Sequence, residues 1–299
     1  MTLVAVFGPT ASGKSAVAVA LAERLGGEIV SCDAMQLYAG LPMLTNQPTT
    51  EERARAPHHL IGVWPLDHSG SVAEYGPLAQ RTIDAVLERG RPAIVVGGSG
   101  LYLRAALAGL DLPPQPRNGA RERHQELYDR LGAEAAHARL AQLDPAAAAG
   151  VHQNDRRRVV RALELAETGA SLAPAADTLW APEWRRPVRI FGLVTDPGDL
   201  AARIAARTEA MFDLGVEVEV AAATATELSA TARRIHGLQD VRALLAGEID
   251  RAEAIRRLTV RTRQYARRQR TWMRRIPELT PIDVSSGPDA AAEAILACL

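Results

Sequence analysis

The segment from Gly8 to Ser15, with the sequence GPTASGKS, constrains the fold of this chain more than any other feature. It matches the phosphate-binding pattern G-x-x-x-x-G-K-[ST] at every fixed position. The apolar run Leu3 to Phe7 precedes it, and a helical pattern from Ser15 to Leu25 follows it. Strand, loop and helix are the context that the motif requires, so the sequence predicts an α/β core whose first loop binds an anion.

Lys14, inside this loop, is the only lysine among the 35 lysine and arginine residues of the chain. Arginine serves at every other basic position, which indicates that this site needs the compact point charge of an ammonium group. In the predicted geometry, loop N–H groups surround the phosphates and Lys14 neutralises their charge. The Ser15 hydroxyl can then ligate Mg²⁺. An ordinary glycine-rich turn before a helix would require none of these features.

Composition excludes several classes of protein. With 299 residues, 47% of them hydrophobic, the chain can bury a large core and carry an inserted domain. The two cysteines, Cys32 and Cys298, are too few for a zinc site or a disulfide framework, and we expect Cys32 in the core. No signal segment or membrane span is apparent, and nothing reads as a coiled coil. We therefore expect a cytoplasmic monomer that does not associate with membranes.

Apolar runs and helical periodicity alternate along most of the chain. Strands are expected at Leu3 to Phe7, Glu28 to Cys32, Ala93 to Val96, Val188 to Val194 and Leu279 to Val284. Helices are expected at Ser15 to Leu25, Val72 to Arg89 and Leu101 to Ala108, and again from Asp196 to about Ile276. The fold class is thus α/β, a P-loop NTPase-like parallel sheet flanked by helices.

Prolines mark an interruption of this alternation. Pro113, Pro114 and Pro116 break the pattern, helical periodicity then dominates, and Pro187 precedes the return to a strand. We expect residues 1–110 and 187–299 to form the core and residues 111–186 to form an inserted all-helical domain.

Two segments that follow predicted strands carry candidate catalytic groups. Asp33 comes directly after the second strand, where side chains of a parallel sheet point into the ligand crevice. It is the candidate general base, although it could orient an acceptor hydroxyl or cap the next segment instead. Ser99 follows the third strand within Gly97 to Gly100 and supplies a hydroxyl at the same edge.

Arginines cluster in two places although the net charge is zero. Arg256 to Arg275 is dense in arginine with Tyr265 and Trp272 interleaved, and a second group occupies Arg156 to Arg161. Arginine beside aromatic residues is typical of contacts with RNA phosphates and unpaired bases. A solvated helix face in an arginine-rich chain explains the same pattern, and the clusters alone leave both interpretations open.

Eight segments in one order resemble a known family, the bacterial tRNA dimethylallyltransferases, also called tRNA isopentenyltransferases. They are GPTASGKS at 8–15, DAMQLY at 33–38, PHHLIG at 57–62, SVAEY at 71–75, VGGSGLY at 96–102, NDRRRVVRALE at 154–164, RIAARTEAMFDLG at 203–215 and TRQYARRQRTWMR at 262–274. The resemblance covers nearly the whole chain. It implies transfer of the dimethylallyl group of dimethylallyl diphosphate to the exocyclic amine of the adenine just 3′ of the anticodon, in tRNAs that read codons beginning with U.

The resemblance also implies roles for particular residues, with Mg²⁺ as the cofactor at Ser15. The residues implied for catalysis are Asp33, Ser99 and Lys14. Those implied for the diphosphate are Gly8, Pro9, Thr10, Ala11, Ser12, Gly13, Lys14, Ser15 and Arg207, with Arg203 as the alternative to Arg207. Those implied for the anticodon stem-loop of tRNA are Asp33, Ala34, Met35, Gln36, Ser99, Arg121, Arg157, Arg158, Val159, Val160, Arg161, Arg233, Gly237, Arg263, Gln264 and Arg268.

The chain departs from the family pattern at three places. Gln47 stands where the family commonly has lysine, and Ile235-His236-Gly237-Leu238 lacks the usual tyrosine. Ser99 replaces the usual threonine. Two other functions therefore stay open at this point: a small-molecule kinase or nucleotide-accepting prenyltransferase, and a noncatalytic P-loop RNA-binding protein.

Overall fold

The chain divides into two compact units. The computed structural model describes residues 2–110, 119–173 and 183–299. The core unit comprises residues 1–109 and 182–299, and the inserted unit comprises residues 110–181. The expected insertion ended at residue 186, but the main-chain N–H of Arg185 donates to the carbonyl of Leu107 at 2.8 Å. Arg185 and Arg186 also pair with Asp84, each at 2.7 Å, and these bonds fasten the returning chain to the core unit.

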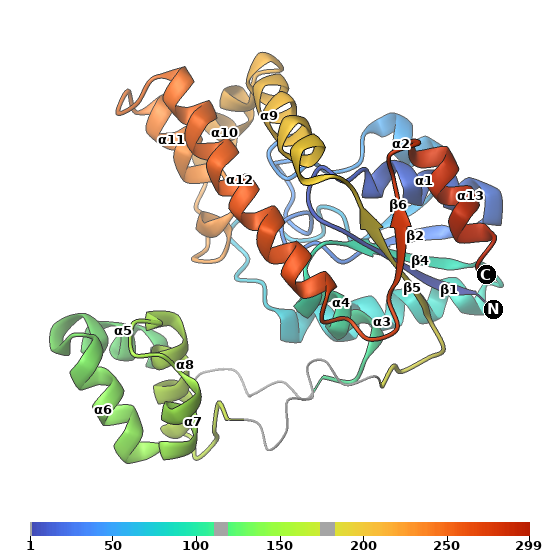
Figure 1. Cartoon of the computed structure of the whole chain (residues 1–299). Helices are drawn as coiled ribbons and strands as arrows, with labels where there is room; N and C mark the ends of the chain where they lie inside the picture. Colours follow the sequence, from blue (N-terminus) through green and yellow to red (C-terminus); the bar gives the residue numbers. More distant parts are fainter. Residues whose placement is uncertain (1, 111–118, 174–182) are drawn as a thin grey trace. The chain divides into compact units, whose positions relative to one another are not determined.

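A parallel sheet of six strands forms the centre of the core unit (Figure 1). Its order is β3-β2-β4-β1-β5-β6, and every neighbouring pair is parallel. The strands are β1 (Leu3–Phe7), β2 (Glu28–Ser31), β3 (His58–His59), β4 (Ala93–Gly97), β5 (Arg189–Val194) and β6 (Thr280–Asp283). The five predicted strands are confirmed to within one residue at each end. The short edge strand β3 lacks an apolar run and was not predicted.

The helices of the core unit begin at capping residues in several cases. Ser71 accepts the N–H of Glu74 at the start of α3, and Asp250 accepts that of Glu253 at the start of α12. These helices are α1 (Lys14–Leu25), α2 (Thr50–Arg55), α3 (Val72–Glu88), α4 (Gly100–Leu107), α9 (Pro197–Asp213), α10 (Val216–Thr224), α11 (Leu238–Leu245), α12 (Arg251–Met273) and α13 (Pro288–Leu296). Helix α13 was not predicted from the sequence.

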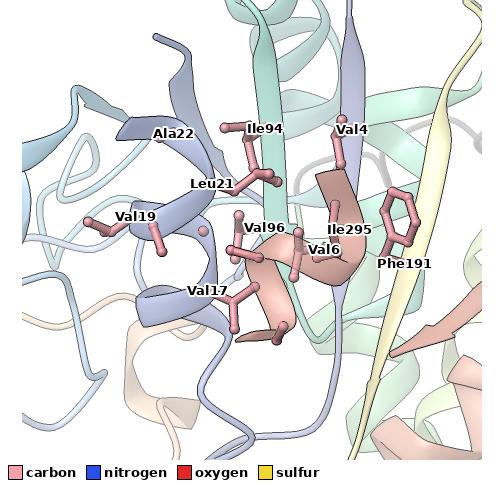
Figure 2. Packing of buried hydrophobic residues seen from close by; sticks show 14 of the residues in the cluster. Val4, Val6, Val17, Val19, Leu21, Ala22, Ile94, Val96, Phe191 and Ile295 are labelled. Carbon is pink, nitrogen blue, oxygen red and sulfur yellow. The ribbon is translucent and has the colours of Figure 1, made fainter. Parts of the chain in front are cut away.

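Alternation along the strands builds a core on each face of the sheet. Val4, Val6, Ile94 and Val96 point to one face, where they pack with residues of α1 and α13 such as Leu21 and Ile295 (Figure 2). The residues between them in the strands point to the other face, which α3 and α4 cover (Figure 1). The sheet is thus buried on both sides, as the near-continuous apolar sequence of β1 and β4 predicts.

Within residues 119–173, the inserted unit has four helices around its own small core. They are α5 (Ala120–Leu131), α6 (Ala133–Leu143), α7 (Pro145–Gly150) and α8 (Arg156–Ala166). Their apolar sides meet at buried residues that include Ala136, Leu140 and Leu163. The carboxylate of Glu164 is fully buried beside this core and accepts hydrogen bonds from Arg121 and Arg161.

Cys32 has no exposed surface and belongs to the core, as expected. Among residues 2–110, 119–173 and 183–299, no helix combines the length and the apolar character that crossing a bilayer requires.

Candidate active site

A cavity of about 370 Å³ opens at the carboxyl ends of the central strands. The phosphate loop follows β1, Asp33 follows β2, and Val96 and Gly97 end β4, so three strands deliver their loops to the same edge. Helices α9 and α12 contribute a further part of the wall through residues that include Arg207 and Gln269. We call this space the site cavity.

The phosphate loop adopts two left-handed residues before its helix. Ala11 has φ of 64° and Gly13 has φ of 90°, and only the second has the conformational freedom of glycine. Thr10, Ala11, Gly13, Lys14 and Ser15 line the site cavity. Gly8, Pro9 and Ser12 are buried beneath them and support the turn. The eight residues of the motif thus divide into a ligand-facing group and a supporting group.

Lys14 and Arg207 bring two positive charges to the cavity. Lys14 Nζ donates to the carbonyl of Pro9 at 2.8 Å, and Arg207 Nη2 donates to Thr10 Oγ1 at 2.7 Å. Burial lowers the pKa of Lys14 to about 8, an effect that the nearby Asp33 carboxylate opposes and Arg207 reinforces. Burial also lowers the pKa of Arg207, which still stays protonated at physiological pH. Two desolvated cations beside one loop favour an anionic ligand.

Two buried donors in this region lack a hydrogen-bond partner within the described part of the chain. They are Ser12 Oγ and Arg207 Nε. Buried polar groups are nearly always paired in native proteins, so each exception calls for a reason. Arg207 lines the site cavity, where an anionic ligand would supply an acceptor for its Nε, whereas Ser12 is not among the lining residues and such a ligand does not account for its hydroxyl.

The residues at the start of α1 fit Mg²⁺ bound together with a diphosphate. Ser15 lines the site cavity and offers a hydroxyl oxygen. Within the described ranges there is no group of three histidine, cysteine, aspartate or glutamate side chains that could enclose a metal ion. Mg²⁺ commonly binds through one or two protein oxygens together with phosphate oxygens and water, so the Ser15 hydroxyl could hold it beside a bound diphosphate.

Asp33, directly after β2 and Cys32, lines the same cavity as the loop residues. Its Oδ1 accepts the N–H of Met35 at 3.0 Å, and its own N–H donates to Ser31 Oγ at 3.3 Å. The carboxylate therefore has a fixed orientation with its second oxygen available for chemistry. Met35 and Gln36 also line the cavity, whereas Ala34 does not.

Ser99 occupies a different environment from the one expected. It is the N-cap residue of α4, is only 8% exposed and is not one of the residues that line the site cavity. Its side chain makes no capping hydrogen bond.

Helix α12 and the segment before α11 supply further cavity residues, of which Thr262 and Gln269 were not predicted. His236 Nε2 lies 2.9 Å from Thr262 Oγ1, and its ring stacks on Tyr265 with 5.7 Å between ring centroids. Burial, aided by nearby arginines, lowers the pKa of His236 to about 4, so it is neutral at physiological pH and has a packing role. Gln269 is 1% exposed and accepts the N–H of Thr10 at 2.7 Å.

This combination of a parallel sheet, a phosphate loop and a facing aspartate agrees with comparisons to known proteins. A family model described as IPP transferase matches residues 36–276, and one described as isopentenyl transferase matches residues 1–57. The chain belongs to the IPP transferase family. It is 43% identical over 297 residues to the tRNA dimethylallyltransferase of Salinispora tropica, covering 98% of this chain and 92% of that protein.

Solved structures of the IPP transferase family have the same fold. The tRNA isopentenylpyrophosphate transferase of Bacillus halodurans is 32% identical, with a TM-score of 0.70 over 99% of this chain and 96% of that one. A eukaryotic dimethylallyltransferase acting on tRNA superposes with a TM-score of 0.75 at 23% identity, over 95% and 74% of the two chains, and supports the fold alone. The chain is therefore a P-loop NTPase-like α/β protein and an enzyme of the prenyltransferase class.

The departures from the IPP transferase pattern have structural explanations. Gln47 donates to the carbonyl oxygens of Gln36, at 3.2 Å, and Tyr38, at 2.7 Å, so its amide fastens the loop after Asp33. Leu238 is fully buried, and Gly237 before it has φ of 87° with Leu258 close by. Both positions maintain the local fold without facing the site cavity.

The arginines of α12 divide into two groups. Arg256 and Arg257 pair with Glu253, and Arg261 pairs with the buried Asp240. Tertiary packing brings the buried Asp240 alongside this arginine-rich helix. No salt bridge forms at the exposed residues Arg263, Arg267 and Arg268 within the described ranges, and Gln264 is exposed beside them. These side chains can reach an external partner.

The inserted unit shows a similar division. Arg121 and Arg161 bind Glu164, as described above, whereas Arg157 and Arg158 are exposed on α8. Val159 and Val160 are buried in the core of this unit, so their side chains cannot contact an RNA and only their exposed neighbours can. In the core unit, Arg233 is exposed in the short 3₁₀ turn Ala232–Arg234.

Proposed function

We propose that this chain transfers the dimethylallyl group from dimethylallyl diphosphate to the exocyclic amine of the adenine 3′-adjacent to the anticodon in tRNAs that read codons beginning with U. The observation that carries the proposal is the site cavity, where Asp33 faces Lys14 and Arg207 across one space. The relatives named above act on tRNA, and the diphosphate is the anion that the loop chemistry accommodates.

The reaction forms one C–N bond and breaks one C–O bond. The lone pair of the adenine amine attacks C1 of the dimethylallyl group, and the diphosphate leaves with the electrons of the C1–O bond. Because the amine lone pair is delocalised into the ring, Asp33 accepts the amine proton as the new bond forms. Lys14, Arg207 and the loop N–H groups stabilise the negative charge that develops on the diphosphate. Mg²⁺, held at Ser15, would neutralise part of that charge.

Recognition of the adenine requires that it leave the anticodon stack, which costs a few kcal/mol that protein contacts must offset. Asp33 and Gln36, on the loop after β2, are placed to bind a base that enters the site cavity. Exposed arginines bind the phosphate backbone of the RNA. They are Arg263 and Arg268 of α12 and Arg157 and Arg158 of the inserted unit.

A transfer assay tests the proposal. Purified protein, Mg²⁺ and labelled dimethylallyl diphosphate are combined with two acceptors, an anticodon stem-loop carrying three adenines after the third anticodon base, and free AMP. We expect label in the RNA alone. Label in AMP alone would identify a nucleotide-accepting prenyltransferase. Binding of RNA and diphosphate without any transfer would identify a noncatalytic protein.

The first prediction concerns protons taken up on diphosphate binding. Because the pKa of Lys14 is about 8 in the free protein, close to half of it is uncharged at pH 8. A bound diphosphate raises that pKa, so binding takes up about half a proton at pH 8 and affinity falls as the pH rises further. Isothermal titration calorimetry in two buffers of different ionisation enthalpy measures this uptake. Lys14→Met should abolish it, and equal uptake by that variant would contradict the assignment.

A second prediction concerns the inserted unit. Arg157→Ala should weaken tRNA binding and make the slope of log K against log salt shallower by about one. Filter binding at salt concentrations from about 50 to about 200 mM measures both the tRNA affinity and this slope. Arg139→Ala, which removes the same charge from α6, should leave the slope unchanged. Equal slopes for the wild type and Arg157→Ala would exclude Arg157 from the RNA-binding surface.

A further inference from the structure

Gln269 connects the arginine-rich helix α12 to the phosphate loop. Its Oε1 accepts the main-chain N–H of Thr10 at 2.7 Å, although the two residues are 259 positions apart in the sequence. The side chain is 1% exposed and lies against Gly98, where an added Cβ atom would collide with the Gln269 amide nitrogen. Tyr265, one turn earlier on the helix, lines the same cavity. The amide is therefore held between Thr10 and Gly98.

Thr10 is fixed by two helices from outside its own loop. Gln269 of α12 binds its main-chain N–H, and Arg207 of α9 donates to its Oγ1 at 2.7 Å. The next residue, Ala11, adopts φ of 64°, a left-handed conformation that is unfavourable for a residue with a Cβ atom. Such a conformation persists only where the surroundings determine it, and the bonds to Thr10 are immediately beside it.

We infer that Gln269 is a positioning residue that sets the geometry of the phosphate loop by binding the N–H of Thr10. With that amide directed toward Gln269, the later part of the loop, from Gly13 to Ser15, presents the groups that bind the diphosphate. This inference rests on the proposed function only in taking the ligand of the loop to be a diphosphate. Gln269 acts through Thr10 and does not itself touch the reacting atoms.

The inference predicts a selective loss in Gln269→Met. Methionine has a similar length but cannot accept a strong hydrogen bond, so the Thr10 N–H loses its partner beneath the cavity. We expect the affinity for inorganic pyrophosphate with Mg²⁺ to fall by about tenfold or more. The KM for dimethylallyl diphosphate should rise by a similar factor, while the KM for tRNA and kcat at saturation change less than about threefold.

Thr208→Val provides a matched control. Thr208 is also a buried polar residue, on α9, but its hydroxyl donates to the carbonyl of Ile204 at 2.9 Å and it is not among the residues that line the site cavity. This variant should bind pyrophosphate like the wild type. Wild-type affinity in Gln269→Met, or equal losses in both variants, would overturn the inference.

Amide hydrogen exchange of the wild-type protein gives a second test that does not depend on how a variant folds. The N–H of Thr10 should be protected in the absence of ligand, because Gln269 is already bound to it, and pyrophosphate should add little protection there. Rapid exchange of Thr10 in the free protein would overturn the inference. A wild type that does not bind pyrophosphate would instead contradict the proposed diphosphate site, and the exchange measurement would still decide the role of Gln269.

Discussion

Asp33→Asn should lower the single-turnover rate of dimethylallyl transfer by about a hundredfold or more, with tRNA affinity nearly unchanged. A positioned general base typically contributes a factor of roughly 10² to 10⁴, and an amide cannot accept the amine proton. Asn tests proton transfer more selectively than Ala does, because it changes the side chain less. Asn can still accept the N–H of Met35 through Oδ1, the bond that orients residue 33 in this structure. Rapid-quench measurements at saturating tRNA and diphosphate give the rate.

Asp33→Ala separates the chemical role of this residue from its local structural role. It loses both the proton acceptor and the bond to Met35, so it should be as slow as Asp33→Asn and also have a lower melting temperature. If the two variants lost tRNA affinity to the same extent as rate, Asp33 would serve mainly to hold the base. An unchanged rate in Asp33→Asn would remove it from catalysis altogether.

The sheet could be predicted from the sequence because its strands are apolar and each is followed by a recognisable loop. The run before GPTASGKS and the run before Gly97-Gly98 are buried on both faces, which leaves little ambiguity about their conformation. The strand His58–His59 has no such signal, because a two-residue edge strand is defined by its hydrogen bonds to β2 and not by its composition. Backbone pairing of this kind appears only in three dimensions.

The candidate site was predicted where it depends on local sequence and missed where it depends on tertiary packing. Lys14, Ser15 and Asp33 follow directly from motifs at strand ends, and all three line the cavity. Thr262 and Gln269 reach the cavity because α12 packs against α9 and α4 within the core unit. A signal for them exists in the helix itself. Both lie on the buried stripe that contains Leu258 and Ala266, and a polar residue on such a stripe requires a partner.

The arginine clusters show why composition alone could not identify RNA-binding residues. The arginines of α8 are close together in the sequence, yet Arg156 and Arg161 pair with carboxylates of Asp129 and Glu164, whereas Arg157 and Arg158 are exposed and form no salt bridge within the described ranges. Position within the packed helix decides which guanidinium groups are available. Of the RNA contacts proposed for the arginines of α8, those of Arg157 and Arg158 remain.

Lys14→Met should reduce kcat/KM for dimethylallyl diphosphate by about 10² to 10³, the range for loss of one group that stabilises a developing negative charge. The folded protein should tolerate the change. Burial lowers the pKa of Lys14, which means that the charged ammonium is disfavoured in the free protein, and methionine removes that penalty. We therefore expect no fall in melting temperature. Activity within tenfold of the wild type would mean that another group holds the leaving diphosphate.

Lys14→Arg tests why the only lysine of an arginine-rich chain occurs at this position. The substitution keeps the positive charge but replaces a compact ammonium with a planar guanidinium that needs more room. Lys14 Nζ already lies 2.8 Å from the carbonyl of Pro9, so the loop closes around a small group. We expect Lys14→Arg to recover less than about a tenth of wild-type kcat/KM. Recovery to the wild-type value would show that charge alone is required, and the lysine would then have no geometric explanation.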